Sequence, residues 1–153
     1  MAALNIFDQF IEDLAHGVHN FSAHTLKIYL TDAAPSASAD AVKADLAEIA
    51  AGNGYTSGGN ACALVSSGQT AGAYALVLAD PAQWIASGGS IGPFRYAVLY
   101  NDSAPGDPLI GWWDAGGEMT INAGFYFSVD LDTINIDLSA RFETVLRLSA
   151  QFS

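Results

Sequence analysis

The chain has 153 residues, and its 16 Asp and Glu against 5 Lys and Arg give a formal net charge of -11. A field of this sign repels polyphosphate, so the composition predicts a protein that does not bind nucleic acid. The first residues carry acidic side chains within an apolar pattern and have no basic leader, so they predict neither a signal peptide nor a membrane span. The length suits one domain, residues 1–153, made in the cytosol.

An amphipathic helix is predicted within the N-terminal segment, residues 1–20. Apolar residues recur at spacings of three and four between Leu4 and His16, and Gly17 provides a stop. The apolar face of this helix either docks on a partner or packs on the domain's own sheet. The candidate contact residues on it are Phe7, Phe10, Ile11 and Leu14.

The middle of the chain predicts a change from helix to strands. Residues 25–30 predict a strand, 33–40 a loop, 41–51 a short second helix with Leu46 and Ile49 facing inward, and 52–59 a Gly-rich loop. Further strands are predicted at 61–66, 73–79, 83–86, 94–100, 109–114, 125–130 and 133–138.

The run PFRYAVLYNDSAPGDPLIGWWD, residues 93–114, predicts a β-hairpin, because two alternating segments flank a loop of Asn, Asp, Pro and Gly. One face of its first strand is expected to hold Phe94, Tyr96, Val98 and Tyr100. The adjacent Trp112 and Trp113 are expected on opposite faces of the second strand. Both are candidate partner-binding residues, since aromatic residues are enriched at the centres of interfaces.

Short strands at intervals of about ten residues indicate a mainly β chain. We predict an antiparallel β-sandwich or barrel-like domain with an N-terminal amphipathic helix and one short helix. The C-terminal tail, residues 131–153, is ambiguous from 141 onward. Alternating Phe142, Thr144, Leu146 and Leu148 favour a strand, and a short helix is the alternative.

Charge is nearly absent between Glu48 and Asp102, where only Asp80 and Arg95 are charged. Exposed strand edges usually carry Lys, Glu or Pro, which prevent pairing with another chain. We therefore interpret this stretch as covered by neighbouring molecules. The alternative is that its strands are central and its loops are rich in Gly and Ser.

No residue pattern predicts catalysis, a metal site or a cofactor. His16, His19 and His24 lack partner ligands at a recognised spacing, no serine lies in a G-x-S-x-G elbow, and the loop at 52–59 lacks the P-loop lysine. The acidic run through Asp130, Asp132, Asn135 and Asp137 does not have EF-hand spacing, so we interpret it as a solvated acidic face. The single cysteine, Cys62, is expected to be a buried apolar side chain.

Four segments carry a resemblance to a known group of proteins. They are GVHNF at 17–21, DLAEIAAGNGYTSGG at 45–59, IGPFRYAVLYND at 91–102 and PLIGWWD at 108–114. In content and order they resemble small virion structural proteins of tailed bacteriophages. The resemblance touches most of residues 4–129, and the chain departs from it after Asp130.

The resemblance implies a virion component without catalytic residues, assembled in the host cytoplasm. The expected function is a capsid decoration or cement protein that stabilises the head from outside. Its expected partners are the major capsid protein and its own copies, as a homo-oligomer such as a trimer. The alternative is a tail or fibre component that binds a receptor or glycan, and an enzyme acting on the host envelope is a third class.

Overall fold

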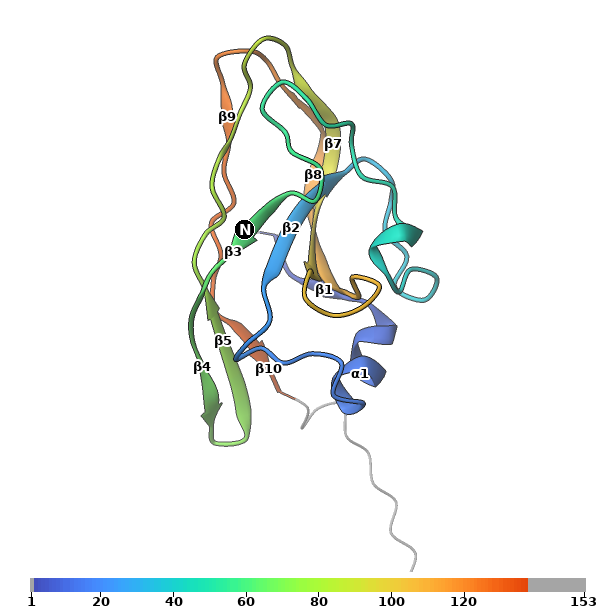
Figure 1. Ribbon diagram of the computed structural model, residues 1–153, viewed down its shortest axis with the longest axis vertical. Helices are drawn as coiled ribbons and strands as arrows, with labels where there is room; N and C mark the ends of the chain where they lie inside the picture. The colour runs from blue at the N-terminus through green and yellow to red at the C-terminus, as the bar shows by residue number, and fades with distance from the viewer. Residues whose placement is uncertain (1, 138–153) are drawn as a thin grey trace, which may run out of the picture.

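The computed structural model describes residues 2–137, which form mainly antiparallel β-structure with one α-helix (Figure 1). The largest sheet has the strand order β1-β8-β7-β2-β3. Its strands are β1 (Asn5–Ile6), β2 (Leu26–Thr31), β3 (Asn60–Cys62), β7 (Ile91–Asn101) and β8 (Leu109–Ile121).

Two smaller β units and two helical segments complete the described chain. A three-stranded sheet has the order β10-β5-β4, and β6 pairs with β9 as a ribbon. These strands are β4 (Leu64–Thr70), β5 (Ala73–Leu78), β6 (Trp84–Ile85), β9 (Tyr126–Phe127) and β10 (Ile134–Ile136). The helical segments are α1 (Asp8–Ala15) and the 3-10 turn η1 (Lys43–Asp45).

The elements form a sandwich-like arrangement of two β layers. Figure 1 shows β4, β5, β9 and β10 on one side, facing the sheet that contains β2, β7 and β8. The main hydrophobic core includes side chains from both layers, such as Leu76 and Leu78 from the first and Ile28 and Leu99 from the second. The prediction of a mainly β, antiparallel, sandwich-like fold is confirmed.

The central strands of the large sheet are buried on both faces. In β2, Ile28 and Leu30 belong to the main core, whereas Tyr29 between them belongs to a second cluster on the opposite face. In β7, Leu99 and Val98 divide in the same way, and all five residues are 0% exposed. The continuous apolar run IYL at 28–30 suits a strand with no solvated face.

The predicted hairpin is confirmed, but one of its predicted faces is wrong. β7 and β8 pair antiparallel from Ile91 and Ile121 to Tyr100 and Leu109. Val98 and Tyr100 share the second cluster as expected, whereas Phe94 packs in the main core. The strand pairing is irregular at this point, because Phe94 and Tyr96 lie two positions apart whereas their partners Met119 and Asp114 lie five apart. Such bulges bend and twist a strand pair.

The N-terminal helix is shorter than predicted. Asn5 and Ile6 pair instead with Trp112 and Gly111 as the edge strand β1, and α1 begins only at Asp8. Leu4 and Ile6 therefore reach the core from extended backbone. After the helix, Gly17 has a φ of 73°, in agreement with the predicted stop.

The second predicted helix, residues 41–51, is wrong, because only η1 is helical there. Hydrogen bonds to distant parts of the backbone use amide and carbonyl groups that an α-helix would need. Leu109 donates its amide to the carbonyl of Ala41, and Ile49 donates its amide to the carbonyl of Leu30. Tertiary pairing outweighs the helix propensity of this short Ala-rich stretch.

The Glu48 carboxylate holds the segment after η1 against the large sheet. It accepts hydrogen bonds from the Tyr55 hydroxyl at 2.7 Å and the Gly58 amide at 2.6 Å, and it pairs with Lys43 at 2.8 Å. Burial raises the pKa of this carboxyl, but the hydrogen bonds from Lys43, Tyr55 and Gly58 outweigh it, so the net pKa is lowered. The second cluster is thereby covered by a loop that is itself fixed.

The close approach of the loop to β2 predicts a severe effect of Gly59→Ala. Gly59 has a φ of +72°, and an added Cβ would lie 1.8 Å from the carbonyl oxygen of Ile28. We expect a loss of about 3 kcal/mol or more in the free energy of unfolding, measured by urea denaturation.

Gly72→Ala is the matched control, because Gly72 also has a positive φ, +85°, but faces open space. We expect it to lower the free energy of unfolding by only about 1 kcal/mol, the cost of placing a non-glycine residue in the left-handed region. Equal losses in the two variants would contradict the steric argument.

Candidate functional site

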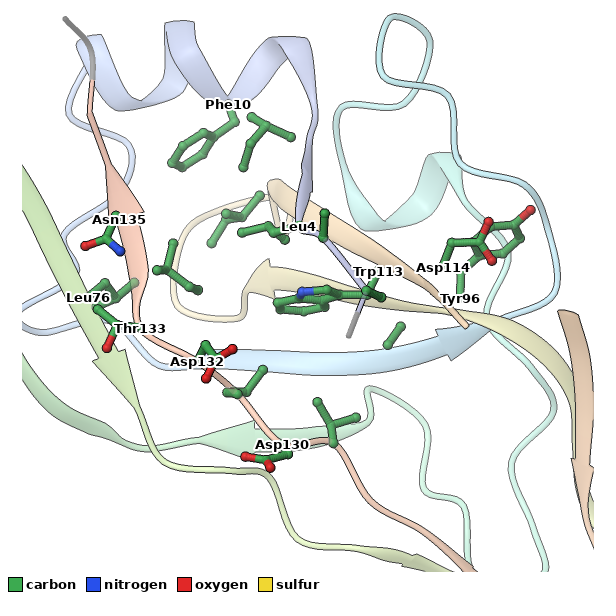
Figure 2. A pocket seen from close by; sticks show the side chains of 18 of the residues that line it. Leu4, Phe10, Leu76, Tyr96, Trp113, Asp114, Asp130, Asp132, Thr133 and Asn135 are labelled. Atoms are coloured by element: carbon green, nitrogen blue, oxygen red, sulfur yellow. The ribbon is translucent and has the colours of Figure 1, made fainter. Parts of the chain in front are cut away.

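The described chain contains an apolar groove of about 1220 Å³. One wall comes from the N-terminal segment, α1 and β8, and the other comes from the segment 127–137 that leads into and through β10. Figure 2 shows Leu4, Phe10 and Trp113 together with Asp130, Asp132, Thr133 and Asn135 around this space. We call it the groove.

One end of the groove is marked by an ion pair. Arg95 donates to both carboxylate oxygens of Asp114, at 2.9 and 3.0 Å, and its guanidinium lies 5.4 Å from the centre of the Tyr96 ring. Hydrogen bonding from Arg95, with help from the Gly116 amide, lowers the pKa of Asp114. Asp114 therefore remains an ionised partner of Arg95 at neutral pH, which is not the state of a general acid.

The acidic residues of the opposite wall lie at its edge. Asp130, Asp132 and Asn135 are exposed. Among residues 2–137, no group of three or more His, Cys, Asp or Glu side chains is placed to hold a metal ion. The predictions of no metal, no cofactor and no enzymatic activity remain predictions. The groove offers an apolar surface for binding.

Cys62 behaves as the sequence predicts. It is 2% exposed and lies in the main core. Burial, with a smaller contribution from the charge of Asp80, raises the pKa of its thiol to about 12. The protonated thiol therefore packs as a small apolar group.

Two of the four predicted contact residues on the N-terminal segment are inaccessible to a partner. Phe7 is 0% exposed and packs against Trp112, and Phe10 is 4% exposed and packs in the main core. Both are corrected to residues that stabilise the fold. Ile11, 44% exposed, and the half-buried Leu14 line the groove.

The two tryptophans of β8 lie on opposite faces, as their spacing predicts. Trp112 is half-buried against the second cluster, with its ring 4.6 Å from that of Phe7. Trp113 is half-buried against the main core and lines the groove. Each residue is held by the protein's own packing, and of the two only Trp113 lines the groove.

A second apolar surface lies on the β6–β9 ribbon, and sequence analysis missed it. Ile85 and Tyr126 are direct cross-strand partners, 57% and 61% exposed, and the neighbouring Phe125 is 66% exposed. The opposite face of the ribbon holds Trp84 and Phe127 against the core. We call Ile85, Phe125 and Tyr126 the outer patch. Alternation in the sequence separates its two faces but does not indicate which one is covered.

Two of the three histidines, the buried His19 and the half-buried His24, form a polar cluster with Asn101 and no recognised metal site. The side-chain oxygen of Asn101 accepts from the Ser103 and Ala104 amides, so its amide nitrogen faces the Nδ1 atoms of His19 and His24 at 3.0 and 2.9 Å. Both Nδ1 atoms must then be acceptors. The cluster ties the segment after α1 to the end of β7.

No family model, curated protein or solved structure matches this chain. In the part of the chain that the structure describes, no helix has the length and hydropathy needed to cross a bilayer.

The burial of Phe10 predicts that it stabilises the fold. We expect Phe10→Ala to lower the free energy of unfolding by about 3 to 5 kcal/mol, because it leaves a cavity in the core. Ile11→Ala, one position along the same helix, is expected to lose less than about 1 kcal/mol. Urea denaturation of both variants checks the assignment, and similar losses would contradict it.

The position of His19 predicts a specific pH dependence of stability. Burial lowers the pKa of His19 below 6.5, and His24 adds to this while Asp13 opposes it. The unfolded chain therefore binds more protons below about pH 6.5, so the stability contributed by neutral His19 is present above that pH and is lost as the pH falls.

His19→Gln should flatten the dependence of the free energy of unfolding on pH between about pH 7 and pH 5, by at most about 1.4 kcal/mol per pH unit. His16→Gln is the control, because the His16 side chain is 67% exposed. Denaturation at a series of pH values measures both, and an unchanged slope in His19→Gln would refute the assignment.

Proposed function

We propose that this protein is a structural, non-enzymatic component of a tailed-phage virion, a capsid decoration or cement protein bound to the outside of the head. The phage assignment rests on the resemblance of the four sequence segments. The net charge of -11 supports an external position, because an acidic protein is repelled by packaged DNA.

The outer patch is the observation that carries the binding role. Its residues are exposed although they are large and apolar, and the ribbon that presents them is anchored by Trp84, which is 1% exposed. A rigid surface loses little entropy on binding, and exposed aromatic residues are typical centres of protein interfaces. The patch is therefore the proposed contact with the major capsid protein or a second copy of this chain.

The edge strand β4 supports assembly as well. All seven of its residues are exposed, and none of them is Lys, Glu, Asp, Arg or Pro. Such an edge is open to pairing with another chain. Each contact can be of moderate strength and many copies still stabilise the shell. A copy that bridges two neighbouring shell subunits binds only while the shell is intact, so its binding free energy favours the intact lattice.

Deletion of the gene from the phage that encodes it tests the proposal. We expect heads without this protein to release DNA at lower temperature than complete heads, and electron cryo-microscopy of complete virions to show the protein on the outer head surface. Density on the tail would favour the receptor- or glycan-binding alternative. Absence of the protein from purified virions would refute both.

Substitutions in the outer patch test the contact itself. Ile85→Asp with Tyr126→Asp should weaken each contact by about 2 kcal/mol or more, roughly 30-fold, and lower the copy number per virion measured by quantitative mass spectrometry. Ala44→Asp with Ala50→Asp, at two exposed residues outside both the patch and β4, is the matched control. Full occupancy by a folded double variant would exclude the patch as the contact.

A further inference from the structure

β4 is the longest edge strand among residues 2–137. It pairs with β5 on one side, and Figure 1 shows it on the side of β5 away from β10. The other edge strands, β1, β3, β6, β9 and β10, have two or three residues each, whereas β4 has seven. Short edges protect a protein from unwanted pairing, because they present few free backbone groups to another strand. Within the described residues, β4 is thus the edge best able to receive a further strand.

The side chains of β4 leave this edge unprotected. All seven are exposed, and none is a charged residue or a proline, the residues that usually block an edge. A register shift lies between Leu64 and Ser66, and regular pairing with β5 runs from Ser66 to Thr70. Gly68, at the centre of this regular segment, contributes no side chain to packing. Backbone hydrogen bonds are therefore the main interaction that the free side of β4 offers.

The distribution of charge favours a second copy of this chain over a foreign partner. Two copies that each carry a net charge of -11 repel one another, and the repulsion is smallest where the surfaces in contact are uncharged. Residues 64–78, which form β4, the turn and β5, contain no Asp, Glu, Lys or Arg. A foreign partner that recognises an acidic protein does so through basic groups, and these find no carboxylate on β4.

We propose that two copies of this protein pair through β4, antiparallel, with a twofold axis at Gly68. In this register Gly68 lies opposite Gly68 of the second copy, Ser67 lies opposite Gln69 and Ser66 lies opposite Thr70. It is the register in which the whole regular segment of β4 is paired. The two three-stranded sheets then form one continuous sheet. The twofold symmetry closes the assembly at a dimer, because each copy uses its own β4 edge to cover that of the other.

The dimer is expected to be weak and to strengthen with salt. A contact along one short strand lies at the low end of protein interface areas, so we expect a Kd of the order of 100 µM. Added NaCl screens the repulsion between two acidic copies, whereas it weakens an interface built of ion pairs. The inference names the partner of β4 and does not depend on a place in the virion, so tests on the purified protein leave the virion proposal untouched.

Analytical ultracentrifugation of the purified full-length protein tests for the dimer. Between about 10 µM and about 1 mM protein, we expect the mean mass to rise from that of the monomer toward twice that value. The rise should begin at lower protein concentration when NaCl is added. A monomer mass over the whole range would overturn the proposal.

A pair of charge variants tests the strand and its register. Ser66→Lys with Thr70→Lys places like charges directly opposite one another at two points of the pair, so we expect the dimer Kd to rise about 10-fold or more. Ser66→Lys with Thr70→Glu places opposite charges at the same two points, so the dimer should form at least as well as in the unmodified chain. The first variant has the lower net negative charge, so overall repulsion alone would give the reverse order.

The matched control carries the same change in charge away from β4. Ala44→Lys with Ala50→Lys, at two exposed residues, should dimerise at least as well as the unmodified chain. Urea denaturation of each variant checks that the fold is kept. A dimer that withstands the two lysines on β4 but is lost in Ile85→Asp with Tyr126→Asp would assign the contact to the outer patch and overturn the proposal.

Disulfide crosslinking locates the axis without added charge. Gly68→Cys should give a crosslinked dimer on mild oxidation, because directly opposed Cα atoms lie about 4.5 to 5.5 Å apart. A Cβ added at Gly68 meets nothing within 4 Å, and the native Cys62 is buried, so the background is low. Ser66→Cys is the matched control and should not crosslink, because its two thiols lie about 14 Å apart along the pair. Equal crosslinking at both positions, or none at Gly68, would refute the antiparallel pair.

Discussion

The fold depends on burying both faces of β2 and β7. Strands with no solvated face need a covering layer on each side, and the chain supplies two different ones. On one side, β5, β6, β9 and β10 contribute the apolar side chains of a sandwich-like core. On the other, a loop with little regular structure is fixed by Glu48 and its hydrogen bonds to Tyr55 and Gly58. If either layer were lost, apolar side chains in the middle of the large sheet would meet water.

This two-sided requirement explains where the candidate surfaces lie. The layer opposite the large sheet consists of short strands in two separate units, and such units cannot cover the whole sheet. The groove lies where that layer meets β8 and α1, and the outer patch lies on the far face of the ribbon whose near face fills the core. Both surfaces thus result from covering a long hairpin with short strands.

Several ionisable groups of the described chain stabilise the fold. The described cations are used in ion pairs, the Asp114 carboxyl is kept ionised by Arg95, and the Cys62 thiol is kept protonated by burial. His19 and His24 share one amide donor, Asn101, and are thereby held in position. These groups stabilise the fold.

The sequence by itself determined the mainly β class, the hairpin of β7 and β8, the opposite faces of Trp112 and Trp113, the buried Cys62 and the position of most strands. These features follow from local alternation and turn residues, which act over a few positions. The strand expected at 141–153 lies outside the described residues.

Only the tertiary structure decided the remaining features, since they depend on partners far apart in the chain. Asn5 and Ile6 form a strand because they pair with the edge of β8. Residues 41–51 form only the short turn η1, because Ala41 and Ile49 make backbone hydrogen bonds with Leu109 and Leu30. Phe94 packs in the main core beside an irregularity in the β7–β8 pairing. The groove and the outer patch could not be predicted from the sequence either. Alternation identifies an apolar face of a strand but does not show whether a second layer covers that face.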